Sequence, residues 1–217
     1  MRNELLNVII LIIIVGGLSY LTALDETSLY NQQEKDAGLS SDSSDLSGYF
    51  LTIYGGRYTD RHLLDKVLML KPIYYEDSWM QAIALGKNIY QKSSLFRLEV
   101  ETQFANHIGE QKHYEFNVLF VFRLLNITSN FQLPFSLAFG NGLSYATEVP
   151  KIEERSRTNL NASRLLNYLL LEIATDLPSI PNWEIIGRIH HRSGVFGLFN
   201  NVHGGSNIMT IGLRYFL

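Results

Sequence analysis

Two histidines, two arginines and a serine lie within six residues, as RIHHRS, from Arg188 to Ser193. The stretch begins like a β-strand, in which successive side chains point to opposite faces. Alternate residues therefore form two sets. His191 and Ser193 continue a face that starts apolar, whereas Arg188, His190 and Arg192 share the other face.

His191 and Ser193 are the residue types of a general base and a nucleophile. Side chains two residues apart on a strand are neighbours on one face, and a histidine there could take the proton of a serine hydroxyl. A third group is needed to orient the imidazole. Asn207, in the next strand-like segment, has the parity that would bring it to the same outer face. The competing interpretation is a polar rim at a membrane interface, without chemistry.

Eight strand-like segments follow one another from residue 48 onward. Ordinary strands have about 5–6 residues, whereas a tilted strand that spans a membrane needs about 9–11. Several of these segments have about 10–14 residues. They are Gly48–Tyr58, Ser78–Tyr90, Ser94–His107, His113–Leu125, Gln132–Gly142, Ala162–Thr175, Asn182–Ser193 and Ser206–Leu217.

Alternation within these segments separates an apolar face from a charged face. In HYEFNVLFVFRLL, from His113 onward, every even position is apolar or aromatic, and the odd positions include Glu115 and Arg123. This pattern fits a barrel with lipid outside and a polar lumen inside. Charges of both signs could pair in a filled interior. They are Arg97, Glu99, Glu101, Glu115, Arg123, Glu172 and Arg188.

The connections favour the same architecture. They are mostly long after odd-numbered segments and shorter after even-numbered ones, with Ile108–Lys112 as the exception. Outer-membrane barrels have long external loops and short periplasmic turns. We therefore predict an all-β fold, an eight-stranded antiparallel transmembrane β-barrel over residues 48–217, closed so that no sheet edge meets lipid. A soluble barrel held by an anchor is the other option.

The first 47 residues differ from the barrel segment. Leu5–Leu24 carries no charge, and its apolar core has the length of a signal-peptide hydrophobic region, although the whole run is also about as long as a membrane span. We expect residues 1–24 to be a signal peptide or an N-terminal anchor. The polar, Ser-rich and acidic residues 25–47 are expected to form a disordered linker.

Composition excludes several classes of function. The chain has 217 residues, no cysteine and a net charge of −3. Without cysteine there are no disulfides and no thiolate metal sites, and the charge gives no reason to expect a nucleic-acid partner. His107 and His113 flank a loop without clear metal partners, so we expect no metal and no cofactor.

The last thirty or so residues, RIHHRSG…HGGSNIMTIGLRYFL, resemble the lipid A 3-O-deacylases, PagL-type barrels that are acyloxyacyl hydrolase-like. That family has an H-x-S motif near the end of the next-to-last strand and an acidic or amide residue on the last. The resemblance implies that His191 is the base, Ser193 the nucleophile and Asn207 the orienting residue. Family members commonly have Asn after the serine as an oxyanion group; here Gly194 offers its backbone N–H.

The resemblance implies an outer-membrane serine esterase that removes an ester-linked acyl chain from lipid A. Its partner would be the lipopolysaccharide of the outer leaflet, and its location the outer membrane of a Gram-negative bacterium. The alternative is a non-enzymatic small barrel with a structural, adhesive or binding role through its external loops. The sequence leaves open which acyl chain is cut and whether the barrel oligomerises.

Overall fold

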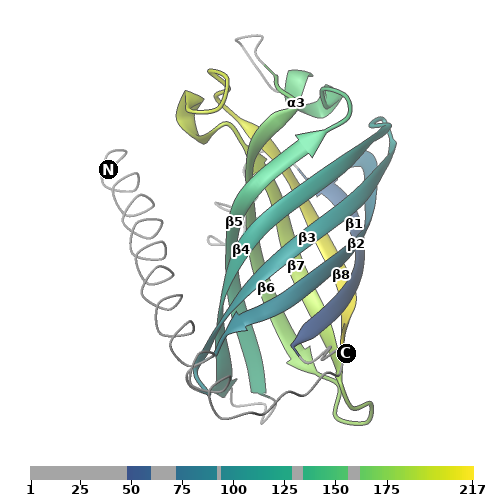
Figure 1. Cartoon of the computed structure of the whole chain (residues 1–217). Coiled ribbons are helices and arrows are strands. Elements are labelled where there is room, and N and C mark those ends of the chain that lie inside the picture. Colours follow the sequence, from purple (N-terminus) through teal and green to yellow (C-terminus); the bar gives the residue numbers. More distant parts are fainter. Residues whose placement is uncertain (1–47, 60–71, 92–93, 129–133, 156–161) are drawn as a thin grey trace. The chain divides into compact units, whose positions relative to one another are not determined.

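The computed structural model describes residues 48–59, 72–91, 94–128, 134–155 and 162–217. Its eight antiparallel strands are hydrogen-bonded in chain order, and β1 also pairs with β8, so the sheet closes into a barrel (Figure 1). The strands are β1 (Tyr49–Thr59), β2 (Tyr75–Tyr90), β3 (Phe96–Gly109), β4 (His113–Thr128), β5 (Pro134–Ala146), β6 (Leu165–Asp176), β7 (Trp183–Ser193) and β8 (Gly205–Phe216). The predicted fold is confirmed. The expected signal peptide or anchor (1–24) and linker (25–47) lie outside the described residues.

Strand ends differ from the sequence-based expectation where the alternation is weak. β5 continues four residues beyond the predicted end at Gly142, because Leu143, Ser144 and Tyr145 keep their pairing with β4 and β6. β2 and β4 each have 16 residues. Strands of that length cross a bilayer even when strongly tilted.

The outer surface is the apolar face that the alternation predicts. On β4, Phe116, Val118 and Phe120 are exposed, whereas Glu115 and Arg123 are fully buried. A soluble protein seldom exposes a continuous apolar band, and lipid is the solvent that such a band fits. This is the architecture of an outer-membrane barrel.

Paired charges fill the lumen. Glu172 accepts hydrogen bonds from three arginines, Arg123, Arg188 and Arg214, at 2.6–2.8 Å. Arg188 also bonds both oxygens of Glu101 at 2.8 and 3.2 Å. The predicted pairing of lumen charges is present, and it reaches across the barrel between strands that are not neighbours.

α3 (Lys151–Arg155) and the loop between β7 and β8 lie at one end of the barrel, and the C-terminus lies at the other (Figure 1). Glu153 of α3 is buried and accepts from Arg192 at 3.0 Å and from Ser206 at 2.8 Å. The short helix therefore covers the lumen at that end, which we call the external end. No helix within the described ranges has the length and apolar character needed to cross a membrane.

Candidate functional site

β7 separates the RIHHRS cluster into two faces. His190 and Arg192 are buried in the lumen, where His190 Nε2 lies 2.9 Å from Glu115 Oε1 and Arg192 Nε donates to Ser144 Oγ at 2.8 Å. His191 and Ser193 have the opposite parity and are only partly buried. Strand geometry thus turns this pair to the outer surface at the external end of β7.

β8 brings Asn207 to the same outer face, directly opposite His191 in the register of the two strands. His191 Nδ1 and Asn207 Oδ1 are 2.7 Å apart. An amide oxygen can only accept, so Nδ1 carries the proton and donates it to this bond. The other ring nitrogen, Nε2, is then left with its lone pair, which is the form that a general base requires.

Ser193 follows His191 on the same face, about 7 Å further along the strand at ~3.3 Å per residue. Its Oγ accepts a hydrogen bond from the backbone N–H of Val195 at 3.1 Å. The structure therefore unites the His191–Asn207 pair directly. Among the described residues, Ser193 makes no hydrogen bond to His191, and its hydroxyl is turned towards the loop.

The expected oxyanion role of the Gly194 N–H does not fit the hairpin. This N–H donates to the carbonyl of Gly204 at 2.9 Å and so closes the end of the β7–β8 ladder. A Cβ atom at Gly194 would lie 1.9 Å from the Val202 carbonyl oxygen. Close backbone approach therefore explains the glycine, and the nearest backbone donor to the serine oxygen is the Val195 N–H instead.

The loop after Ser193 has an unusual backbone. Val195 and Phe196 have φ values of 48° and 56°, a region that a β-branched residue such as valine rarely adopts. The two residues form a 3₁₀ turn over Val195–Gly197. Strained conformations of this kind gather at functional sites, and here the strain fixes the N–H that faces the serine hydroxyl.

Sequence reasoning missed two residues that barrel closure adds to this face. β1 pairs with β8, so Thr59 lies opposite Asn207 and its Oγ1 donates to the Asn207 carbonyl at 3.4 Å. Arg57 lies two residues before Thr59 on β1, with its guanidinium over the ring of Trp79 at 4.9 Å. Closure of the barrel makes β1 a neighbour of β8, and this neighbourhood was the signal from which both residues could have been found.

Within the described ranges, one group of side chains has the residue types and spacing to hold a metal ion. It comprises His107, His113 and Glu115, at the external end of the lumen. These side chains face inward, away from the face that carries His191 and Ser193.

No family model matches the chain, and no curated protein matches it significantly. Among solved structures, the barrel is similar to the crystal structure of neisserial surface protein A (NspA). The two are 11% identical with a TM-score of 0.47, and the match covers 79% of this chain and 98% of the neisserial chain.

Proposed function

We propose that this barrel is an outer-membrane serine esterase that removes an ester-linked acyl chain from lipid A. The observation that carries the proposal is the 2.7 Å bond from His191 Nδ1 to Asn207 Oδ1, next to Ser193 on the lipid-facing surface. A tautomer-fixed histidine beside a serine is the arrangement that nucleophilic acyl transfer needs. Its depth near the external end corresponds to the outer-leaflet headgroups, where the acyl esters of lipid A lie.

In the proposed reaction, His191 Nε2 takes the proton of Ser193 as Oγ attacks the ester carbonyl carbon. The tetrahedral intermediate collapses, the sugar oxygen leaves with that proton, and an acyl-serine remains. Water, deprotonated by the same histidine, then releases the fatty acid and restores the serine. Asn207 holds the imidazole in one tautomer throughout.

A rotation of the serine side chain precedes the attack. Ser193 Oγ accepts from the Val195 N–H at 3.1 Å and must turn towards His191. That N–H is then free to donate to the developing oxyanion, which is the kind of fixed backbone dipole that lowers acyl-transfer barriers. Val195 thus takes the role that the sequence alone gave to Gly194.

The surroundings of the pair suit an anionic lipid. Arg57, on the same outer face, is partly exposed, and its nearest acidic partner, Asp77, is 3.9 Å away. Its Nε donates to the Glu76 carbonyl at 2.8 Å and its guanidinium lies over Trp79 of β2. Two interstrand steps of about 4.8 Å separate β1 from β7, so the side chain must turn from β2 towards β8 to meet a phosphate on a lipid seated over His191. Phe196 and Leu198, both exposed in the β7–β8 loop, offer apolar contact to acyl chains.

Mass spectrometry of lipid A from cells that express either the wild-type chain or Ser193→Ala tests the proposal. We expect wild type to remove one hydroxyacyl chain and the variant to leave lipid A intact, with both barrels present in the outer membrane at equal levels. Unchanged lipid A in both strains would contradict the esterase proposal and favour a non-enzymatic barrel that acts through its external loops.

A further inference from the structure

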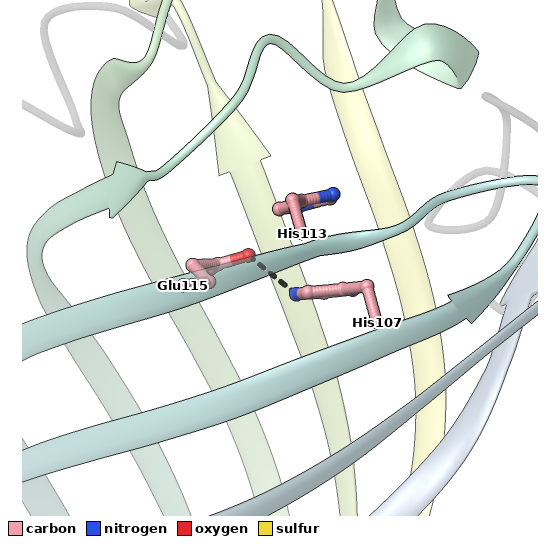
Figure 2. Close-up of side chains that lie close together, drawn as sticks. All are labelled: His107, His113 and Glu115. Atoms are coloured by element: carbon pink, nitrogen blue, oxygen red, sulfur yellow. Dashed lines mark ion pairs between the residues drawn. The ribbon is translucent and has the colours of Figure 1, made fainter.

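Three side chains of the types that ligate metals lie close together inside the barrel at its external end. Figure 2 shows His107, from the end of β3, beside His113 and Glu115, from the start of β4. One ligand atom from each lies within 4.8 Å of the others, and all three side chains are buried. The β3–β4 register sets His107 directly opposite His113, and their rings stack at 4.2 Å.

Each of the three side chains has one buried polar atom without a hydrogen-bond partner among the described residues. His113 Nε2 is buried and bonds to no described group. His107 Nε2 lies 3.0 Å from Glu115 Oε2 (the dashed line in Figure 2), but neither atom is aligned in a hydrogen bond there or elsewhere among the described residues. Buried polar atoms are nearly always satisfied, so an unpartnered His113 Nε2 beside a His107–Glu115 ion pair that is not aligned as a hydrogen bond points to a ligand here.

The remaining polar atoms of His107 and Glu115 are held in place. Tyr58 OH lies 2.8 Å from His107 Nδ1, and Glu115 Oε1 is within 2.9 Å of both His190 Nε2 and Ser144 Oγ. Metal-binding histidines and carboxylates are typically supported in this way, with one atom anchored and the other left for the ion.

We propose that His107, His113 and Glu115 bind a divalent transition-metal ion of the Zn²⁺ class. Two imidazoles and one carboxylate are a ligand set that Zn²⁺ accepts, with a fourth position left for water. Tetrahedral coordination at about 2.1 Å places ligand atoms roughly 3.4 Å apart. The rings of His107 and His113 are stacked nearly parallel, at 10°, so one ring must turn before both direct a nitrogen at the same ion.

The charges around the cluster permit a cation. Arg192 Nε is 3.9 Å from Glu115 Oε2, but its guanidinium also bonds to Glu153 at 3.0 Å, so a second carboxylate offsets it. A bound ion would join β3 to β4 and, through Glu115 and His190, to β7 across the lumen. The site is therefore structural, it stabilises the external end of the barrel, and it is independent of the proposed esterase site on the outer face.

The test uses the full-length protein, folded in detergent micelles and treated with a chelator before titration with ZnCl₂. We expect one Zn²⁺ per chain, a rise in Tm on binding, and at least about tenfold weaker binding in His113→Gln. His203→Gln is the matched control, because His203 is exposed in the β7–β8 loop, and it should bind as wild type does.

Co²⁺ substitution of the wild-type protein gives a readout that needs no variant. Intense visible absorption bands, removed by excess Zn²⁺, would show a tetrahedral site with nitrogen ligands. Folded wild-type protein that takes up no Zn²⁺ and gives no such spectrum would overturn the proposal. So would zinc binding that His203→Gln weakens as much as His113→Gln does.

Discussion

The bond between His191 Nδ1 and Asn207 Oδ1 joins two residues that are 16 positions apart in the chain. Each is placed by its strand, without help from a flexible loop, because β7–β8 pairing sets the two Cα atoms opposite one another. Sites built on strands hold their geometry better than sites on loops. The pair therefore holds the imidazole in one tautomer.

Replacing Asn207 tests that role at the scale of one hydrogen bond. Asn207→Leu keeps the volume and removes the acceptor, so we expect kcat to fall about tenfold while KM changes little. Asn207→Asp replaces a neutral acceptor with a carboxylate that stabilises the imidazolium, and kcat should rise by about the same factor. Steady-state hydrolysis of a lipid-like ester in micelles measures kcat and KM for both variants. An unchanged kcat in Asn207→Leu would show that Asn207 does not orient the imidazole.

From the sequence, the positions of these residues could be predicted only where they lie on strands. Parity alone placed His191 on the outer face and His190 in the lumen, because side chains alternate strictly along a strand. It could not give the partner of Ser193 Oγ or of the Gly194 N–H, which depend on the positive φ values of the following loop. It also missed the cluster of His107, His113 and Glu115, although His113 and Glu115, two residues apart in HYE, have the same parity.

At the scale of elements, the β7–β8 hairpin is the part of the fold that shapes the candidate site. Gly194 and Gly205 both sit where two backbones touch, and a Cβ at Gly205 would lie 1.8 Å from the Arg192 carbonyl oxygen. Glycine alone fits such an approach. The hairpin is thereby closed tightly just beyond Ser193.

Gly194→Ala should therefore disturb the loop and leave the barrel folded. We expect a large fall in the proposed esterase activity, because the added methyl group pushes Val202 and, with it, the loop that carries the Val195 N–H. Gly187→Ala is the control on the same strand, since its Cβ would meet only the Ile173 side chain at 3.4 Å. Heat-modifiable migration in SDS gels shows whether each variant forms a folded barrel. Equal activity in both variants would contradict this account of the hairpin.

The strands themselves were largely predictable and the contacts across the lumen were not. Length, alternation and the order of the connections indicated eight spanning strands, and closure follows because an open edge is costly in lipid. Arg188 and Glu101, in contrast, are 87 residues apart in the chain and meet only because the barrel has a particular diameter and stagger. Parity tells which side chains enter the lumen, but not which of them pair.

The whole molecule divides into an apolar exterior and a charged interior, so the bilayer acts as its outer solvent. A positive charge on the exterior should cost more near mid-bilayer than at the rim. Val118→Arg, near the middle of β4, should destabilise the barrel by about 2–4 kcal/mol, and Leu165→Arg, at the external end of β6, by about 0–1 kcal/mol. Urea unfolding in lipid vesicles measures both, and equal costs would contradict a transmembrane position for this surface.

The most direct test of the central claim is fatty-acid release from purified lipid A by the purified barrel in mixed micelles. The account predicts that wild type releases a hydroxy fatty acid and that Ser193→Ala or His191→Ala lowers the rate by about 10³-fold or more. His203→Gln, altered in the external loop, should retain the wild-type rate. A folded wild-type barrel that releases no fatty acid, or a Ser193→Ala barrel as active as wild type, would contradict it.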